Sequence, residues 1–251
     1  MEPYALPDQI YAAALAFLRV GAVVMLIPGI GEGFVPARIR LGFALLLALC
    51  VGPIAKASLP AMPPSLGEMG GQMFKELIVG LTLGGLMRFF LSSLAVAGEV
   101  IAIQTTLAFA QTANPLQAQP GGAITSFLTL LGVVLLFASD VHYLFIGAIA
   151  RSYSLFAPAR HVLVQDAAAV ALKTMSTTFA LGVQLAAPLL VFSLVFNVAL
   201  GFVGRVMPQF QVFFAGSPLI LLFGLSIFAL SLGTGMLIWL DSYRDFLRMF
   251  T

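Results

Sequence analysis

The chain has 251 residues, of which 61% are hydrophobic and 9% are charged, and its formal net charge is +2. Soluble globular domains average about 45–50% apolar and about 25% charged residues, so this composition excludes an ordinary soluble domain. The small net charge gives no indication of nucleic-acid binding. The lone cysteine, Cys50, excludes a disulfide framework and a cysteine metal site, and its apolar surroundings predict a small buried side chain.

Six apolar segments follow one another along the chain. They cover residues 10–27, 41–54, 74–110, 124–150, 167–204 and 211–240, and their length and content of Leu, Ala, Phe and Met predict six helices. Because a membrane span needs about 20 apolar residues, the chain can hold five or six spans. Acidic Glu2 and Asp8 stand where a signal peptide would be basic, so we expect the first segment to be retained.

Two of these segments have unusual lengths. The second is too short to span a bilayer comfortably, which indicates a tilted, re-entrant or protein-buried helix. The third is too long for one straight crossing at about 1.5 Å per residue. It should therefore tilt strongly, bend, or break near Gly84–Gly85 or near Gly98.

The last two segments contain prolines and very little charge. From residue 174 to residue 240 the only charged side chain is that of Arg205. Proline removes a helical hydrogen bond, so we expect the helices to divide at Pro188, Pro208 and Pro218. The simplest arrangement is a helical hairpin that turns between Arg205 and Pro208.

Five charged residues lie within or beside apolar segments, namely Arg19, Lys75, Glu76, Arg88 and Glu99. An ionisable group at mid-bilayer costs at least about 2.5–3.5 kcal/mol, so each should pair, snorkel or face water. Arg88 and Glu99 share a helix face but lie roughly 16 Å apart along it, so each needs a partner on another helix or subunit. Structural pairing is favoured over a proton or ion relay.

Small and polar residues recur at helical spacing in two places. Asn197, Gly201 and Gly204 follow an i, i+4, i+7 pattern, and Gly80 and Gly84 form a small-xxx-small pair. Such stripes let helix backbones approach closely. Packing within the chain and packing against a partner protein explain them equally well.

The orientation in the membrane has a weak signature. The distribution of Lys and Arg over the connections favours cytoplasmic termini. Trp239 and Tyr243 at one end, and Tyr4 and Tyr11 at the other, suit aromatic belts at the membrane interfaces.

Nothing in the sequence forms a catalytic set. The two histidines, His142 and His161, belong to no HExxH motif or cysteine–histidine pair, and Gly29–Gly33 follows no predicted strand. His142 beside Asp140 could bind a proton or a metal, but a helix-end residue at an interface is favoured. We therefore predict no enzyme activity, no cofactor and no metal.

Several strings resemble the FliR/SctT family of type III secretion export-gate subunits. Their order and spacing match the family over almost the whole chain. The most specific string runs from Ala187-Pro188 through Asn197-Val198-Ala199-Leu200-Gly201 and Arg205-Val206-Met207-Pro208-Gln209 to Phe213 and Gly216-Ser217-Pro218. The others are Phe17-Leu18-Arg19-Val20-Gly21, Pro28, Pro36 with Arg38 and Arg40, Gly98-Glu99-Val100-Ile101-Ala102-Ile103-Gln104 continuing through Phe109 to Asn114-Pro115, Asp140-Val141-His142-Tyr143, Ser152-Tyr153 and Pro158.

The resemblance implies an all-α membrane protein that forms one export-gate domain over residues 1–251. Residues 10–150 would be FliP-like helices and residues 167–245 a FliQ-like hairpin. The chain would join FliP-like and FliQ-like subunits, attended by FlhB-like and FlhA-like proteins, at the flagellar basal body in the bacterial inner membrane. There the assembly would conduct unfolded flagellar proteins outward.

The resemblance also assigns two sets of residues. The connection after the third segment would help to plug the closed gate, and its uncharged, proline- and glycine-bounded composition suits that task; the residues concerned are Phe109, Gln111, Asn114, Pro115, Gln117, Gln119, Pro120 and Gly121. Assembly and packing would involve Arg19, Arg88, Glu99, Gln104, Pro188, Asn197, Gly201, Arg205, Pro208, Gln209 and Pro218.

Three alternatives remain open at this point. The first is an injectisome export-gate subunit, which the same family includes. The second is a small secondary transporter, with helices broken at Pro188 and Pro218, although no convincing internal repeat is visible. An intramembrane enzyme is the third, and it lacks a paired catalytic set.

Overall fold

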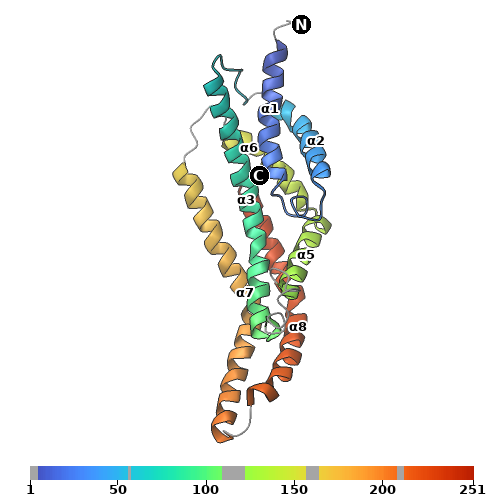
Figure 1. Cartoon of the computed structure of the whole chain (residues 1–251), viewed down its shortest axis with the longest axis vertical. Helices are drawn as coiled ribbons and strands as arrows, with labels where there is room; N and C mark the ends of the chain where they lie inside the picture. The colour runs from blue at the N-terminus through green and yellow to red at the C-terminus, as the bar shows by residue number, and fades with distance from the viewer. Residues whose placement is uncertain (1–4, 56–57, 109–121, 157–163, 208–211) are drawn as a thin grey trace. The chain divides into compact units, whose positions relative to one another are not determined.

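A computed structural model describes residues 5–55, 58–108, 122–156, 164–207 and 212–251. Over these ranges the regular structure is α-helical and no strand occurs, which confirms the predicted all-α class. The helices, shown in Figure 1, are α1 (Ala5–Val24), α2 (Ala37–Ala55), α3 (Leu66–Gln104), α5 (Gly122–Ala138), α6 (His142–Leu155), α7 (Val164–Val206) and α8 (Val212–Arg248).

Most of these helices have the length and apolar composition of membrane spans. Five qualify separately, and a sixth span results if α5 and α6 count as one broken crossing. The predicted number of spans is thus confirmed. The second segment was predicted to be too short, and this is wrong: α2 has 19 residues, because the helix includes Ala37–Arg40 before the apolar run.

The predicted helix breaks at Pro188 and Pro218 do not occur, and neither does the break that was one of three alternatives for the third segment. α3 is a continuous helix of 39 residues that passes through Gly84, Gly85 and Gly98. α7 runs through Pro188 and α8 through Pro218 without interruption. A single missing hydrogen bond does not end a long apolar helix, because neighbouring groups can satisfy the freed carbonyl.

A real break divides the fourth segment, which was predicted to be one helix. The Val141 N–H donates to the Leu136 carbonyl at 3.1 Å, and the Asp140 N–H donates to the Phe137 carbonyl at 3.4 Å. These bonds form a Schellman motif at the end of α5, with Asp140 in the left-handed conformation at φ 60°. The motif carries no glycine, which is why the sequence did not reveal it.

The turn between the last two helices follows the prediction as far as it is described. α7 ends at Val206 and α8 begins at Val212, while Pro208 and Gln209 lie outside the described residues. Phe192 of α7 packs on Phe223 of α8, with ring centroids 6.4 Å apart. The two helices therefore form the expected hairpin, which Figure 1 shows in orange and red.

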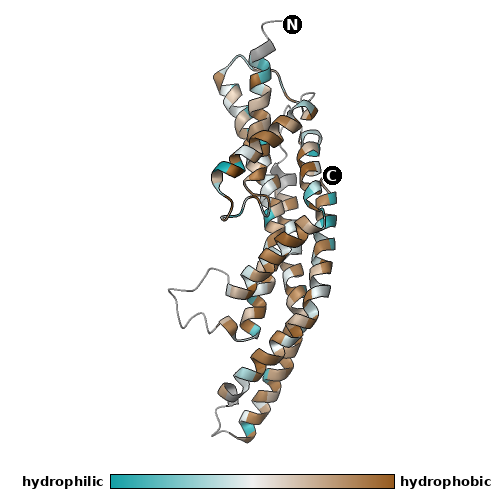
Figure 2. Cartoon of the chain, turned by 90° about the vertical axis from the view of Figure 1, so that its right-hand side faces the viewer, coloured by the Kyte–Doolittle hydropathy of each residue, from teal (hydrophilic) through white to brown (hydrophobic). Residues whose placement is uncertain are grey.

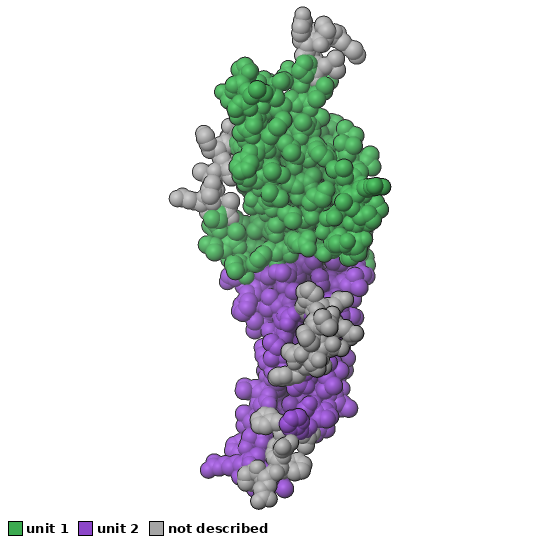
Figure 3. All heavy atoms as spheres, viewed as in Figure 1, with its two compact units in different colours: residues 1–90, 136–175, 243–251 green, residues 91–135, 176–242 purple. Residues whose placement is uncertain are grey.

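The chain divides into two compact units, coloured separately in Figure 3. Unit 1 comprises residues 1–90, 136–175 and 243–251, and unit 2 comprises residues 91–135 and 176–242. Helices α3, α5, α7 and α8 each contribute residues to both units. The predicted division into FliP-like and FliQ-like parts stays a prediction.

The core of unit 1 contains an aromatic cluster at the end of α8. Tyr243 is fully buried and packs edge-on against Phe90, with ring centroids 5.1 Å apart. Its hydroxyl donates to the Met87 carbonyl at 2.8 Å, so its polar atom is satisfied without water. Tyr11 is also buried in this unit, and the predicted position of both tyrosines at a membrane interface stays a prediction.

The core of unit 2 surrounds Trp239. This side chain is fully buried, and its indole N–H donates to the Ser93 hydroxyl at 2.9 Å. Gly132 leaves room for the side chain, since a Cβ at Gly132 would lie 3.2 Å from the indole, and the predicted position of Trp239 at a membrane interface stays a prediction. Close packing explains why a large aromatic residue can be buried here.

Candidate functional site: polar residues within the apolar helices

Arg19 on α1, in unit 1, is the most deeply buried charged residue in the described part of the chain. Its guanidinium forms a bidentate pair with Glu76 of α3, with Nε–Oε2 at 2.6 Å and Nη2–Oε1 at 2.9 Å. The two side chains are 0% and 1% exposed. The predicted need for a partner is confirmed for Arg19, and the pair joins the first and third helices.

The remaining donors of Arg19 reach the end of α6. Nη1 donates to the Ser152 carbonyl at 2.9 Å, and Nη2 donates to the Phe156 carbonyl at 2.9 Å. The Tyr153 ring lies against the guanidinium, whose central carbon is 4.1 Å from the ring centroid. The Ser152 carbonyl also accepts the Phe156 N–H at 2.8 Å, whereas Phe156 is the C-cap residue, whose carbonyl lies at the negative end of the helix dipole. Arg19 therefore caps α6 through Phe156 while it pairs with Glu76.

Two glycines allow α1 and α3 to approach closely beside this cluster. A Cβ at Gly80 would lie 2.5 Å from the Arg19 carbonyl oxygen, and a Cβ at Gly84 would lie 3.0 Å from the Val23 Cα. The Gly80–Gly84 pair is therefore used for packing within the chain. We call the contact of α1 with α3 at these glycines and the Arg19–Glu76 pair the α1–α3 seam.

Arg88 and Glu99 are paired separately, as their spacing required. In unit 1, Arg88 reaches Glu32 at 3.5 Å and the Gly31 carbonyl at 3.4 Å. In unit 2, the Glu99 carboxylate accepts a hydrogen bond from the Thr125 hydroxyl at 3.3 Å. Thr125 lies in the first turn of α5, where the helix dipole favours a nearby negative charge. Both residues thus have a structural partner on another part of the chain.

The end of α3 is held by α7 in unit 2. The Ser193 hydroxyl donates to the Gln104 side-chain oxygen at 2.5 Å, and Ser193 is buried. The Asn197 amide donates to the Ser193 carbonyl of its own helix at 2.7 Å. Gln104 therefore has a partner on α7 in this unit, and its predicted role in assembly stays a prediction.

The outer surface of the α7–α8 hairpin holds the other predicted assembly residues. Pro188, Asn197, Gly201, Arg205 and Pro218 are all exposed. A Cβ added at Gly201 would meet nothing within 4 Å, so this glycine has no packing role within the described residues. We call the exposed stripe formed by Asn197, Gly201 and Arg205 the α7 outer face.

A second open feature of the hairpin is a groove between α7 and α8 of about 540 Å³. Gln184 and Pro188 line it from α7, and Ser231 and Thr234 line it from α8. Only 17% of the most apolar part of each helix is buried, against 50% for α1 and for α3. Figure 2 shows how apolar the helices remain along their length.

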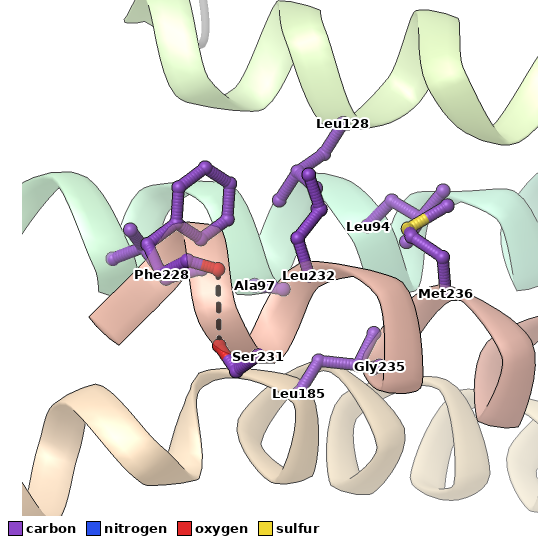
Figure 4. A pocket seen from close by; sticks show the side chains of 10 residues that line it. Leu94, Ala97, Leu128, Leu185, Phe228, Ser231, Leu232, Gly235 and Met236 are labelled. Carbon is purple, nitrogen blue, oxygen red and sulfur yellow. Dashed lines mark hydrogen bonds between the residues drawn. The ribbon is translucent and has the colours of Figure 1, made fainter. Parts of the chain in front are cut away.

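A small apolar cavity in unit 2 has too little space for a ligand. It has a volume of about 20 Å³, which is the space of about one water molecule. Figure 4 shows its apolar lining from α3, α5, α7 and α8, in which the Ser231 hydroxyl bonds within its own helix to the Phe228 carbonyl. In the described part of the chain no three His, Cys, Asp or Glu side chains converge to hold a metal.

Part of the sequence-based site could not be placed. The plug residues Phe109, Gln111, Asn114, Pro115, Gln117, Gln119, Pro120 and Gly121 lie outside the described residues, as do Pro208 and Gln209.

Sequence reasoning also missed the partners of Arg19. Glu76 could have been recognised as a partner because it is a charged residue inside an apolar segment, whereas nothing in the sequence points to the main-chain carbonyls of Ser152 and Phe156. Cys50 was predicted to be buried and is exposed on α2.

These features define a multi-span all-α membrane protein with one tightly packed polar seam and a largely uncovered C-terminal hairpin. The chain matches the family described as bacterial export proteins, family 1, over residues 10–246. It is 51% identical over 251 residues to the flagellar biosynthetic protein FliR of Caulobacter vibrioides, with both chains fully covered.

More distant relatives have the same name. Identity is 28% to FliR of Escherichia coli, over 84% of this chain and 80% of the relative, and 29% to FliR of Bacillus subtilis, over 84% and 82%. The chain therefore belongs to the bacterial export proteins of family 1 and is a membrane component of flagellar export. Its relatives are named for flagellar biosynthesis rather than for catalysis.

Proposed function

We propose that the chain is a subunit of the flagellar type III export gate and assembles with FliP-like and FliQ-like subunits in the bacterial inner membrane, at the flagellar basal body. The assembly forms the conduit through which unfolded flagellar proteins leave the cell. FlhB-like and FlhA-like proteins associate with this assembly. In this proposal residues 10–150 are the FliP-like part and residues 167–245 the FliQ-like hairpin.

One observation carries this proposal: the α7 outer face is polar and small, yet uncovered. Asn197 and Gly201 lie one turn apart on a helix of membrane-spanning length, and nothing within the described chain fills the space over Gly201. Lipid tails have no use for a polar stripe, whereas close helix–helix packing in membranes uses small and hydrogen-bonding residues. A helix of another subunit is the occupant that this chemistry favours.

The proposal predicts that the tagged chain, extracted from its own cells in mild detergent, co-purifies with FliP-like and FliQ-like subunits. Gly201→Leu should abolish this recovery, because the larger side chain blocks close approach of a partner helix. Gly71→Leu is a matched control, since Gly71 of α3 also has open space beside it. A stable, functional monomer that never retains these partners would contradict the proposal.

The plug role of the connection between α3 and α5 is part of the same proposal and needs its own test. Deletion of residues 111–119 should leave assembly intact but make the closed gate permeable to ions and small molecules. Conductance of the assembled complex in planar bilayers measures this directly. An assembled deletion variant with the conductance of the natural complex would refute the plug role.

The transporter alternative loses its main support from the continuity of the last two helices. A secondary transporter was suggested by helices broken at Pro188 and Pro218. Both helices are uninterrupted at these positions. The relatives quoted above are all flagellar proteins, which favours the flagellar over the injectisome system.

A further inference from the structure

An apolar groove lies between α1 and α2, which pack against each other in unit 1 (Figure 1). Its volume is about 390 Å³, within the range of about 300–1,000 Å³ that is typical of ligand pockets. Phe17 lines it from α1, and Leu45, Leu49 and Gly52 line it from α2, while Gln9 supplies a polar side chain. A Cβ at Gly52 would meet nothing within 4 Å, so no described residue fills the groove at this position.

The face of α2 that lines the groove also carries an arginine. Successive residues of an α-helix are about 100° apart, so positions 38, 45, 49 and 52 lie on one face. Arg38 is exposed and has no ion-pair or hydrogen-bond partner within the described residues. At about 1.5 Å per residue, Leu45 and Leu49 follow Arg38 by roughly 10 Å and 16 Å along the helix. This face therefore has a basic end and an apolar end.

No acidic residue of α2 balances the charge of Arg38. From residue 33 to residue 55 the charged residues are Arg38 and Arg40, and Glu32 is already paired with Arg88 at 3.5 Å. Because α2 has the length and composition of a membrane span that begins at Ala37, Arg38 lies at the end of that span, where phospholipid headgroups are found. A negatively charged headgroup is the electrostatic complement of this end.

The size of the groove favours a single acyl chain over a helix. A helix with its side chains is about 10–12 Å across, so a volume of about 390 Å³ holds roughly one helical turn. An acyl chain is roughly 4 Å wide, because carbon atoms touch at about 3.5–4.0 Å, and it can lie along the groove. The acyl chains of one leaflet reach about 15 Å, half of a hydrocarbon core of about 30 Å, which matches the separation of Leu49 from Arg38.

We propose that this groove, the α1–α2 groove, binds one acyl chain of an anionic phospholipid whose phosphate is held by Arg38. The acyl chain lies on Leu45 and Leu49, and the guanidinium donates a charge-assisted hydrogen bond to a phosphate oxygen. The charge of Arg38 distinguishes this site from the rest of the lipid-facing surface of α2. The proposal goes beyond the export function proposed above and does not rest on it.

Native mass spectrometry can count the lipids that the full chain retains. The chain, purified from its own cells in detergent, is titrated with dioleoylphosphatidylglycerol or with dioleoylphosphatidylcholine. We expect one tightly bound lipid, a preference for phosphatidylglycerol, and no release of this lipid by inorganic phosphate. Arg38→Gln should weaken phosphatidylglycerol binding about fivefold, which corresponds to about 1 kcal/mol for one basic residue near the membrane surface, and should remove the preference.

Arg40→Gln is the matched control for the headgroup. It removes the same charge two residues further along, but Arg40 lies about 200° round the helix from Arg38. The preference for phosphatidylglycerol should therefore stay within about twofold of that of the natural chain.

Gly52→Leu tests the position of the acyl chain. The new side chain has open space and occupies part of the groove, so binding of both lipids should weaken about fivefold or more, because apolar surface of the groove is no longer available to the lipid. Gly71→Leu on α3 also has open space and should leave binding unchanged.

Four results would each overturn the lipid site. The first three are equal affinity of the natural chain for the two lipids, equal effects of Arg38→Gln and Arg40→Gln, and release of the lipid by inorganic phosphate. The fourth is a Gly52→Leu chain that keeps its lipid but loses FliP-like or FliQ-like subunits, since the groove would then hold a helix of a partner.

Discussion

The α1–α3 seam and the α7 outer face use the same residue pattern in opposite ways. Both present two small or polar residues one helical turn apart, Gly80 with Gly84 and Asn197 with Gly201. At the seam the glycines contact another helix of the chain, whereas Gly201 contacts nothing within 4 Å. This difference shows that a stripe of small residues predicts close helix packing, but does not tell whether the packed helix belongs to the same chain or to another subunit.

The two regions also differ in the burial and pairing of their charged residues. The seam contains a buried, fully bonded Arg19–Glu76 pair, while the charged member of the α7 outer face, Arg205, is exposed near the C-terminus of α7. A cation at that helix end is favoured by the helix dipole. The α1–α3 seam is thus formed entirely within one chain, whereas we interpret the α7 outer face as a surface that binds another subunit.

Loss of one seam charge should have the largest effect. Arg19→Met leaves the Glu76 carboxylate buried without its counter-charge, and Glu76→Leu leaves the Arg19 charge buried with only the Ser152 and Phe156 carbonyls as partners, so each should lower the free energy of unfolding by about 3–5 kcal/mol. The double variant removes both charges and should recover much of this loss. Thermal unfolding in detergent, followed by circular dichroism, measures all three. A double variant as unstable as either single one would show that capping of α6, not charge pairing, dominates.

Alanine at the two glycine positions should act with opposite sign. Gly80→Ala places a Cβ 2.5 Å from a backbone oxygen, so helix backbones must move, and we expect a loss of about 1–3 kcal/mol. Gly201→Ala meets no neighbour and should stabilise the isolated chain by about 0.5–1 kcal/mol through helix propensity. The same unfolding assay compares them. Equal destabilisation by both would erase the distinction between the two regions.

Polar changes on the α7 outer face should affect assembly and leave the chain folded. Asn197→Leu removes a hydrogen-bonding group worth about 1 kcal/mol across a membrane helix contact, and Arg205→Ala removes the exposed charge. Recovery of FliP-like and FliQ-like subunits on the tagged chain should fall about fivefold for Asn197→Leu. Normal assembly with blocked export would instead place these residues along the conduit.

The smallest effect is expected outside both regions, at the break between α5 and α6. Glycine adopts the left-handed conformation without strain, so Asp140→Gly should raise the free energy of unfolding by about 0.5–1 kcal/mol after the entropy of glycine is considered. The unfolding midpoint should rise while assembly stays normal. A lower midpoint would mean that the Asp140 carboxylate makes a stabilising contact that outweighs the relief of strain.

Helix existence was predictable because it depends on local composition and length. Within the described residues all six apolar segments form helices, and α7 ends at Val206, next to the predicted turn after Arg205. Helix continuity was not predictable at Pro188, Pro218 or Gly98, because each local defect is small beside the packing of a long helix. At Gly98 a Cβ would lie 2.5 Å from the Thr125 Cα, so this glycine serves packing rather than a break.

For the candidate site, the sequence predicted which charged residues need partners but not which groups these partners are. The sequence indicated that Arg19, Arg88 and Glu99 need partners, since unpaired charges are unfavourable in an apolar setting. It could not indicate that Arg19 binds the carbonyls at the end of α6, because main-chain groups have no sequence signature. It also could not indicate that Trp239 and Tyr243 are buried among other helices of the chain.

By itself the sequence determined the membrane class, the helical content and the resemblance to export proteins, all of which follow from composition and from motifs read along the chain. The tertiary structure decided which polar and small residues are already satisfied within the chain and which face outward. The physical reason is that burial and hydrogen bonding join residues far apart in sequence. Arg19 and Ser152 meet only because α1, α3 and α6 pack together, and Gly201 is open because nothing in the described part of this unit covers it.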